Sequence, residues 1–595
     1  MHRDRLPRRA FLGMAALPGR RSATATALAL ALAAGAAVLG TAPARAVPTA
    51  STTLVVHANQ TLRSVTHVAS GSLYGLDTAT IPADSLVQPL HPNTFVQMAP
   101  GGSQLPNGEP APGGDALVVA PEAARAGAKV VVRMPDWYPN FPYRWVSWSN
   151  WLSAVDTQIA RVRSSGTTNI AAWELWNEPD WTWDTANAGS FDAGWARTFA
   201  EVRSKDAATP IQGPSFSRWD VGWMTTFLKD AIASGTVPNI VAWHELQGAG
   251  GIAANVSAYR SLERSLGLGA RPIAIEEYAT PAEVGVPGPL AGYIAKFERA
   301  GVHDAELAFW NHYGTLGDTL TDTGGSPNGA YWLYRWYGGM SGTMLATAPP
   351  AQTGIDGAAS LNGAGNQIQV VFGGGAGSSA VTVNGLGSLP AFGSTVHVRL
   401  EYTQALGRTT AVSGPITVSD TDVPVTGGSV TVPVVTNASK GYHLVVTPTG
   451  TSTTLAGRYQ IVNRNSRLAL DTVGAGTAQG TGVVQSAPTS GTDQNWTLTA
   501  AGSGLYKIVN QKSGLVLGIN KASTTDGGTA LIWGDNGTAD HLWQVIPATG
   551  GQFLIASYNS GLVLGVTNES TSTGAQVLQW DDNGTPDHLW TLTAR

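Results

Sequence analysis

Two glutamates that follow apolar runs are the residues of this chain best placed to do chemistry. Residues 173–183 read WELWNEPDWTW and contain Glu178, and residues 272–278 read PIAIEEY and contain Glu276 and Glu277. Two carboxyl groups that flank one acetal bond can break it, because one protonates the leaving oxygen while the other attacks the anomeric carbon or activates water. The two runs therefore favour acid–base cleavage of an acetal.

The alternation of side chains along a strand separates the glutamates into roles. On the second run, Glu277 shares a side with the isoleucines two and four residues before it, which we expect to point inward. This favours Glu277 over Glu276 as the reacting group. On the first run, Glu174 and Glu178 share a side, with Glu178 at the strand end. We therefore expect Glu174 to be a buried structural carboxylate paired with Arg133.

Alternating strand and helix patterns must position these carboxylates. Short apolar runs that end in polar residues alternate with stretches of helical spacing, among them residues 116–126, 148–165 and 221–234. Eight such alternations predict a (β/α)8 TIM barrel, in which active sites lie at the carboxyl ends of the strands. A doubly wound sheet is the alternative, but no glycine-rich phosphate turn follows the first strand.

Bulk composition excludes several classes of partner. The net charge is −5, and residues 1–46 carry seven arginines and one aspartate (+6), so the rest of the chain is at −11. An acidic chain argues against a nucleic-acid partner. The chain has no cysteine, which excludes disulfides and thiol chemistry. No histidine spacing typical of metal ligands occurs, so we expect no metal or cofactor, and we expect a monomer.

The N-terminal segment predicts export. Its basic front is followed by the apolar residues 22–40 and by Ala44, Arg45 and Ala46, which form a cleavage signal. Arg8 and Arg9 resemble a twin-arginine signal, with an ordinary basic front as the alternative. No later run reaches the roughly 20 apolar residues of a membrane span. We expect a secreted protein with no membrane anchor.

Composition changes divide the chain further. We assign residues 1–46 to a signal peptide and residues 47–341 to the barrel, whose first strand could join the next domain. Short β-type runs between glycine- and serine-rich turns predict a β-sandwich over residues 342–447. A linker rich in Pro, Gly, Ser and Thr covers residues 448–455. Residues 456–595 contain a repeat, because Trp496, Trp543 and Trp590 recur every 47 residues. Three copies of one β-unit predict a threefold structure.

The motifs over residues 74–337 resemble clan A of the glycoside hydrolases, and family 39 in particular. The resemblance rests on Trp-Asn-Glu-Pro at a strand end and on the Glu-Tyr pair about a hundred residues later. It implies that Glu178 is the acid/base and Glu277 the nucleophile of a retaining enzyme, and that Asn177 binds the sugar 2-hydroxyl. His244 matches the histidine that ends the sixth strand, and Trp310 matches the tryptophan under the sugar. Further candidates for substrate contact are Trp137, at a strand end, and Tyr278, as a donor to the nucleophile.

The repeat resembles a ricin-type β-trefoil carbohydrate-binding module. In that family each unit can hold a sugar with an Asp, an aromatic residue and an Asn. The first unit has Asp471 but Ala487 at the aromatic position, and the other two have glycine at the Asp position. Asp535 or Asp582 could replace the missing carboxylates. The sugar-binding candidates are Asp471, Trp533, Asn536, Trp580 and Asn583. We expect the tryptophans that close each unit to lie in the core.

Together these features predict a secreted retaining glycosidase that acts on plant-type polysaccharide, either xylan or arabinogalactan side chains, and is targeted by a lectin-like module. The alternative is a non-catalytic glycan-binding protein with a degenerate barrel. A Ser-His-Asp hydrolase is disfavoured, since the barrel region lacks a Gly-x-Ser-x-Gly elbow.

Overall fold

Eight parallel strands close into a barrel in the order in which they occur in the chain. The computed structural model describes residues 52–105, 113–308, 316 and 319–595, so the predicted signal peptide and Trp310 lie outside the described residues. The barrel strands are β2 (Gly71–Leu73), β3 (Thr94–Met98), β4 (Lys129–Arg133), β5 (Ile170–Glu174), β6 (Ile211–Phe216), β7 (Ile240–Trp243), β8 (Ile273–Tyr278) and β9 (Asp304–Leu307).

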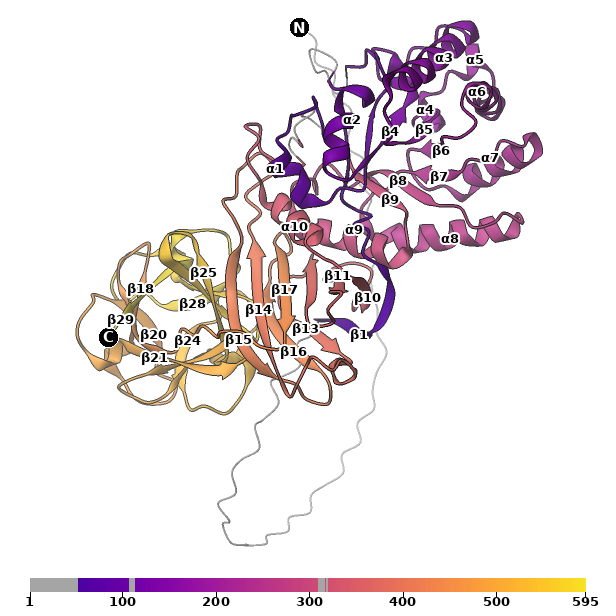
Figure 1. The fold of residues 1–595 in the computed structure, drawn as a ribbon. Helices are drawn as coiled ribbons and strands as arrows, with labels where there is room; N and C mark the ends of the chain where they lie inside the picture. Colours follow the sequence, from indigo (N-terminus) through magenta and orange to yellow (C-terminus); the bar gives the residue numbers. More distant parts are fainter. Residues whose placement is uncertain (1–51, 106–112, 309–315, 317–318) are drawn as a thin grey trace, which may run out of the picture. The chain divides into compact units, whose positions relative to one another are not determined.

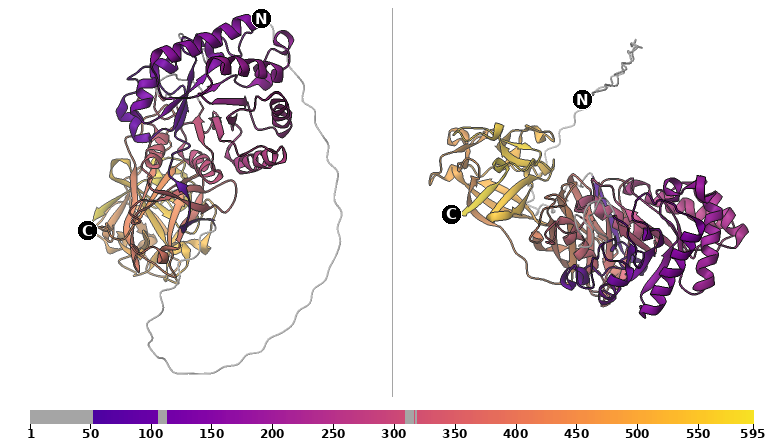
Figure 2. Two further views of the ribbon diagram at one scale, coloured as in Figure 1. Left: turned by 45° about the vertical axis from the view of Figure 1, so that its right-hand side comes forward. Right: turned by 90° about the horizontal axis from the view of Figure 1, so that it is seen from above.

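Helices follow the barrel strands along the chain and lie outside the barrel (Figure 1, Figure 2). They are α1 (Asp84–Val87), α2 (Ala116–Arg125), α3 (Trp148–Ser165), α4 (Pro179–Thr182), α5 (Thr185–Ala188), α6 (Phe191–Lys205), α7 (Val221–Ser234), α8 (Ile252–Ser265), α9 (Pro287–Ala300) and α10 (Gly329–Gly338). Local sequence sets their ends. The Ser147 side chain accepts from Asn150 N at the start of α3, and Gly166 ends that helix with a left-handed φ of 73°.

The barrel strands bury two separate sets of side chains. A small inner cluster contains Val96, Val131, Ala172 and Ala274, and its members all come from barrel strands or the residues next to them. A much larger cluster joins the other face of the strands to the helices and includes Ile273 and Ile275. Members of one strand alternate between the two clusters, as the two-residue period of a strand requires.

Nine further strands form one hydrogen-bonded sheet in the order β15-β14-β17-β12-β11-β10-β1-β13-β16. Strands from both ends of this order share one hydrophobic core, so the sheet folds over on itself like a sandwich. The strands are β1 (Thr52–Ser64), β10 (Thr343–Ala348), β11 (Asp356–Leu361), β12 (Ile368–Gly373), β13 (Gly377–Asn384), β14 (Thr395–Thr403), β15 (Ile416–Pro424), β16 (Val430–Thr436) and β17 (Gly441–Thr447).

The C-terminal part is a twelve-stranded trefoil in which one β-unit occurs three times. Trp496, Trp543 and Trp590 are fully buried, and their indole N–H groups donate to Leu470 O, Leu517 O and Leu564 O at 2.8–3.0 Å. The closing tryptophans are therefore core residues, as expected. The strands are β18 (Gly457–Asn463), β19 (Ala469–Thr472), β20 (Val483–Ser486), β21 (Asn495–Gly502), β22 (Leu505–Asn510), β23 (Val516–Ile519), β24 (Ala530–Trp533), β25 (Trp543–Ala548), β26 (Gln552–Ser557), β27 (Val563–Val566), β28 (Val577–Trp580) and β29 (Trp590–Ala594).

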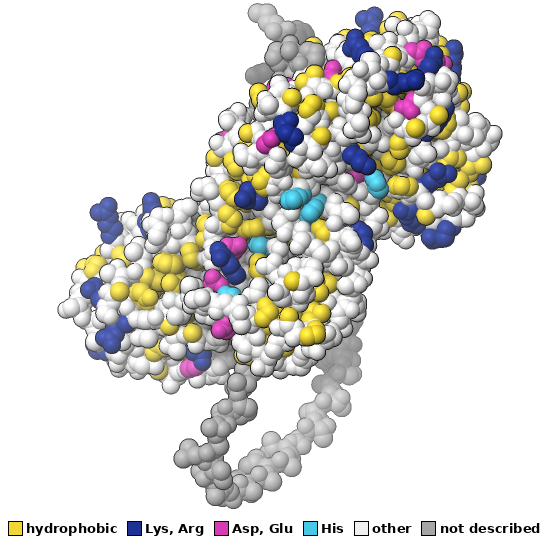
Figure 3. Space-filling model, viewed as in Figure 1, with side chains coloured by type: hydrophobic (Ala, Val, Ile, Leu, Met, Phe, Trp, Pro, Cys, Tyr) yellow, Lys and Arg dark blue, Asp and Glu magenta, His cyan; other side chains and the backbone are white. Residues whose placement is uncertain are grey.

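The predicted fold class is thus confirmed as a parallel eight-stranded barrel, a sandwich-like sheet and a trefoil. Among the described helices, none combines the length and the apolar character that a membrane crossing requires. On the face shown in Figure 3, the basic and acidic side chains of the described residues are scattered among apolar and neutral ones.

Candidate active site

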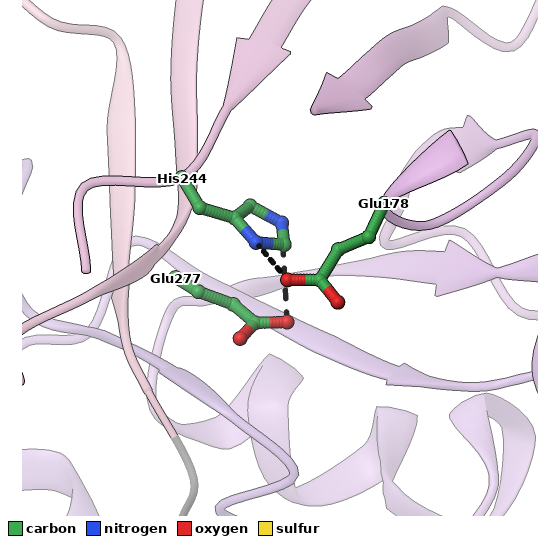
Figure 4. A group of neighbouring side chains, drawn as sticks. All are labelled: Glu178, His244 and Glu277. Atoms are coloured by element: carbon green, nitrogen blue, oxygen red, sulfur yellow. Dashed lines mark hydrogen bonds and ion pairs between the residues drawn. The ribbon is translucent and has the colours of Figure 1, made fainter. Parts of the chain in front are cut away.

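Three side chains from separate strand ends meet at the mouth of the barrel. Glu178 follows β5, His244 follows β7, and Glu277 lies near the end of β8. Figure 4 shows the three pointing toward one another. One carboxylate oxygen of each glutamate and one imidazole nitrogen all lie within 4.8 Å of one another. The structure therefore brings together both glutamates that the sequence selected, with His244 between them.

Glu178 is held in an unusual backbone conformation. The strand β5 ends at Glu174, and Glu178 follows a short loop as the residue before α4, with φ 51° and ψ 51°. This left-handed conformation costs a residue with a side chain about 1 kcal/mol or more. Its amide donates to Ser215 O at 2.9 Å, and its carbonyl accepts from the amides of Trp181 and Thr182. The surrounding contacts thus fix a strained residue at the mouth.

Glu277 reaches the mouth because of an irregularity in β8. Ile273 and Ile275 pack between the barrel and the helices, whereas Ala274 lies inside the barrel. The expected inward side was therefore wrong, and strict alternation would have turned Glu277 toward the helices. The register with β9 shifts between Ile275 and Tyr278, so two successive glutamates can turn inward.

The same irregularity places Tyr278 away from the site, which corrects its expected role. Tyr278 is fully buried among Tyr293 and Phe297, and its hydroxyl donates to Ala69 O at 2.7 Å and bonds the hydroxyl of Tyr334. A residue in this position packs the barrel against its helices. It is not the donor to Glu277.

Arg133 is the donor to Glu277, and sequence reasoning missed this contact. At the end of β4, its Nη1 donates to Glu277 Oε1 at 2.7 Å and its Nε donates to Glu174 Oε2 at 2.9 Å. The expected pair of Glu174 and Arg133 is confirmed. A lone arginine at the end of an apolar strand was the available signal, since a buried guanidinium needs carboxylate partners.

His244 is buried between the two carboxylates. Its Nδ1 lies 3.2 Å from Glu178 Oε1, and its Nε2 lies 3.9 Å from Glu277 Oε1. Burial by itself lowers the pKa of His244, but the negative charge of Glu277 and the hydrogen bond and charge of Glu178 outweigh it and raise the pKa to about 9. The imidazole is therefore cationic at neutral pH.

A second glutamate of β8 lies deeper. Glu276 is fully buried and accepts from Gln212 Nε2 at 2.5 Å. Burial raises the pKa of Glu276, although Arg133 and His244 oppose the shift. Burial also raises the pKa of Glu174 well above its usual range. The carboxylates inside the barrel thus favour protonation, while Glu277 faces Arg133 at the mouth.

Asn177 and Asp136 line the mouth beside the central residues of the site. Asn177 is 2% exposed, and its Oδ1 has no hydrogen-bond partner among the described residues. An unpaired buried oxygen is costly, so it is a candidate acceptor for a hydroxyl from a bound molecule. Asp136 accepts from the hydroxyls of Tyr74 (2.5 Å) and Tyr143 (2.9 Å). Burial raises the pKa of Asp136 to about 7, against the opposing charge of Arg133.

Trp137 does not join this group. The indole of Trp137 lies over the guanidinium of Arg161 on α3, 5.7 Å from the ring centre, and packs against the helix layer. Its expected contact with substrate is therefore not supported, because the turn that follows β4 directs Asp136 to the mouth instead. Trp310 lies outside the described residues.

Glu178, His244 and Glu277 are also the described residues that could hold a metal ion. Two carboxylates and an imidazole are ordinary ligands for divalent cations. The Arg133 guanidinium at 2.7 Å from Glu277 opposes a second cation at this point. The arrangement suits acid–base and nucleophilic chemistry with the side chains themselves.

The trefoil has two similar pockets, in its second and third units. One, of about 420 Å³, is lined by Trp533, Asn536, Asp540 and His541, and the other, of about 220 Å³, by Trp580, Asn583, Asp587 and His588. The predicted tryptophans and asparagines thus share pockets. In each pocket the buried histidine has an Nδ1 that hydrogen-bonds to none of the described residues.

The carboxylates of these pockets are not the expected ones. Asp535 pairs with Lys507 and Asp582 with Lys440. Asp540 and Asp587 line the pockets instead. The glycines at the family's Asp position explain the change, because a Cβ on Gly518 would lie 2.5 Å from the His541 ring.

The first trefoil unit has the Asp that the family pattern calls for. Asp471 Oδ2 accepts from Gln494 Nε2 at 3.1 Å. With Ala487 at the aromatic position, this unit lacks a ring on which a sugar could stack. Asp471 is therefore held as expected but stands without the platform that Trp533 and Trp580 give the other units.

Comparison with known proteins agrees with this geometry. Residues 435–533 and 539–595 match the family of ricin-type beta-trefoil lectin domain-like sequences. The solved structure of N2152 from Neocallimastix frontalis is 35% identical, with a TM-score of 0.64, and the match covers 67% of this chain and 100% of that chain. This chain belongs to the same family as N2152. The name of that protein states no activity.

Two curated relatives do carry activities in their names. A 3-O-alpha-D-galactosyl-alpha-L-arabinofuranosidase of Bifidobacterium longum subsp. longum is 26% identical over 457 residues, which is 64% of this chain and 39% of that protein. A 3-O-beta-L-arabinopyranosyl-alpha-L-arabinofuranosidase of Bifidobacterium pseudocatenulatum is 25% identical over 513 residues, which is 73% of this chain and 50% of that protein. The chain thus spans half or less of these relatives. The predicted kinship with glycoside hydrolases is confirmed.

Proposed function

We propose that this protein is a retaining glycoside hydrolase that removes α-L-arabinofuranosyl side chains from arabinogalactan-type polysaccharide. The observation that carries the proposal is the pair of carboxylates at the barrel mouth, with oxygens of Glu178 and Glu277 within 4.8 Å. Retaining glycosidases hold their two carboxyl groups about 5–5.5 Å apart, whereas inverting enzymes need about 6.5–9.5 Å to admit a water molecule. The short separation supports double displacement.

The site suits both halves of that reaction. In the first, Glu277 attacks the anomeric carbon while Glu178 gives its proton to the leaving oxygen as the glycosidic bond breaks. In the second, Glu178 takes a proton from water, which displaces Glu277 and releases the sugar. Arg133 Nη1 donates to Glu277 Oε1 and holds this carboxyl group in place for the attack. The cationic His244 lies beside Glu178 and stabilises the anion that the first step leaves there.

The relatives favour arabinogalactan over xylan as the substrate. Both are named as arabinofuranosidases whose arabinofuranosyl group carries a sugar on its 3-oxygen. We therefore propose that this enzyme releases 3-O-substituted arabinofuranose as a disaccharide. The strand-end motifs support membership of family 39, and the basic, apolar and Ala-Arg-Ala segments of residues 1–46 support export with cleavage before Val47. N-terminal sequencing of exported protein tests the cleavage.

Turnover by two variants tests the proposed reaction. Glu178→Gln and Glu277→Gln should each reduce the release of sugar by roughly two to four orders of magnitude, since each removes an acid/base or nucleophile. Glu201→Gln, on the outer helix α6, is the control. A fluorosugar that forms a stable glycosyl-enzyme should label Glu277, and NMR of the first product should show retention.

Three outcomes would contradict parts of this proposal. Wild-type turnover in either active-site variant would remove the catalytic assignment. Labelling of Glu276 would overturn the nucleophile alone. Glycan binding with no sugar release from any polysaccharide would favour the alternative of a non-catalytic binding protein.

A further inference from the structure

An exposed aromatic surface begins at the acid/base. Trp181 is 52% exposed, yet its indole Nε1 donates to Glu178 Oε2 at 2.9 Å. Phe141, which is 41% exposed, packs edge-on against Trp181 with ring centres 5.3 Å apart and an angle of 89°. Neighbouring large aromatic side chains are rarely left this exposed unless they contact another molecule. Aromatic rings commonly pack against the apolar faces of ligands.

Both rings of this surface are held firmly. Asp180, beside Trp181, accepts from the amide of Ser217 at 2.9 Å and from its hydroxyl at 2.5 Å. The hydroxyl of Thr182 donates to Asn177 O at 2.6 Å. Phe141 packs against Tyr143, whose hydroxyl donates to Asp136. The exposed rings are therefore held by the same hydrogen-bond network that fixes the mouth. A surface that is already ordered loses little conformational entropy when a ligand binds.

The contact between Trp181 and Glu178 locates the sugar that this surface would face. An acid/base must touch the glycosidic oxygen, and the group on the far side of that oxygen is the leaving group. Arg133 and Glu276 are almost fully buried, whereas Trp181 is 52% exposed, so Trp181 lies on the solvent side of Glu178. The leaving group is the part of the substrate that continues toward solvent, since it belongs to the polysaccharide.

We propose that Trp181 is a positioning residue for Glu178 and that Trp181 and Phe141 together form the platform for the leaving-group sugar. This inference rests on the proposed function. The N–H of Trp181 fixes the rotation of the Glu178 carboxyl group. The proton of Glu178 therefore points at the glycosidic oxygen as the glycosidic bond breaks. The indole face and the Phe141 ring stack on the polysaccharide residue from which arabinofuranose leaves.

Substitutions of Trp181 and Phe141 separate the positioning of Glu178 from the stacking on the leaving-group sugar. Trp181→Phe removes the N–H and keeps a ring, so kcat on an oligosaccharide should fall about tenfold with little change in KM. Trp181→Ala removes both, so KM on the oligosaccharide should also rise about tenfold. Phe141→Ala should raise KM and leave kcat nearly unchanged. Trp332→Phe on α10 is the matched control, because it removes the indole hydrogen bond from Trp332 to Val412 O.

Leaving-group chemistry distinguishes positioning from a general loss of structure. The same variants are assayed on a 2,4-dinitrophenyl glycoside that carries the sugar released by the wild type. A dinitrophenolate needs no proton to leave, so Trp181→Phe should lose less than about twofold there. An equal loss on both substrates, or no loss on the oligosaccharide, overturns the positioning role. An unchanged KM in Trp181→Ala and in Phe141→Ala overturns the platform.

A failure of the proposed function would be recognised separately. If the wild type cleaves neither substrate, the reaction is wrong, and calorimetry with arabinogalactan oligosaccharides still tests the surface. Weaker binding by Trp181→Ala than by Trp332→Phe would then support a glycan platform at the mouth. Equal binding by the two variants would overturn it.

Discussion

At the scale of single residues, His244 couples the state of the site to pH. It is buried beside Glu178 and Glu277, with Glu276 and Arg133 also facing it. Its pKa is raised from 6.5 to about 9 by the two nearest carboxylates against the effect of burial. A histidine that gains a proton in the folded state stabilises it below the unfolded pKa, and this stabilisation is lost as the pH rises through the folded pKa.

The substitution His244→Asn should therefore change the pH dependence of stability. The free energy of unfolding of the wild type should exceed that of the variant by about 3 kcal/mol more at pH 6 than at pH 9.5, since a shift of about 2.5 units corresponds to that energy. Urea denaturation at the two pH values measures it. A difference between wild type and variant that does not vary with pH would show that the pKa of His244 is the same in the folded and unfolded protein.

At the scale of elements, a buried ion cluster ties α9 to β11. Asp356 of β11 pairs with Lys296 Nζ and Arg299 Nη2 of α9, both at 2.7 Å, and the Lys296 and Asp356 side chains are almost completely buried. Buried charges are tolerated when they are paired, and the loss of one partner leaves the other uncompensated. This cluster therefore contributes to the contact between the barrel helix and the sandwich sheet.

Asp356→Ala should destabilise the protein by about 3–5 kcal/mol, because it leaves two cations without their carboxylate. The matched control is Asp84→Ala, which breaks the pair with Arg125 whose side chains are 38% and 40% exposed. That change should cost far less, because water and salt screen an exposed pair. Chemical denaturation of both variants gives the comparison, and similar losses would mean that the buried pair adds nothing beyond a surface pair.

At the scale of the whole molecule, the trefoil adds two pockets that lie far along the chain from Glu178 and Glu277. We expect two sites rather than three, because Trp533 and Trp580 have pockets with a nearby carboxylate and histidine, and Ala487 gives the first unit no ring. Two sites on one module bind a polymer more tightly than either alone, since the second contact is intramolecular.

Trp533→Ala and Trp580→Ala should each weaken binding to soluble arabinogalactan several-fold, and the double variant should weaken it about a hundredfold. Affinity electrophoresis measures this, with thermal unfolding as the check on folding. Val473→Ala, an exposed apolar residue of the first unit, should bind like the wild type. Full binding by the double variant would place the sugar contacts elsewhere.

The sequence by itself determined the architecture and the positions along the chain of the side chains that meet at the barrel mouth. Strand and helix periods are local, and parallel strands expose their carboxyl ends on one rim, so Glu178, His244 and Glu277 could be placed at one mouth without coordinates. The 47-residue spacing of Trp496, Trp543 and Trp590 likewise fixed the threefold module, because a repeat in sequence is a repeat in structure.

Only the tertiary structure decided which side chains face the site. One irregularity in β8 turns Glu277 inward and Tyr278 outward, and a shift of one residue exchanges the two faces of a strand. Arg133 meets Glu277 from a strand 144 residues away, and Trp181 meets Glu178 through the turn of α4. Asp540 replaces the expected carboxylate because Gly518 leaves space for His541. These contacts depend on strand register and on the room left between segments that are distant in sequence. A local sequence pattern predicts neither of them.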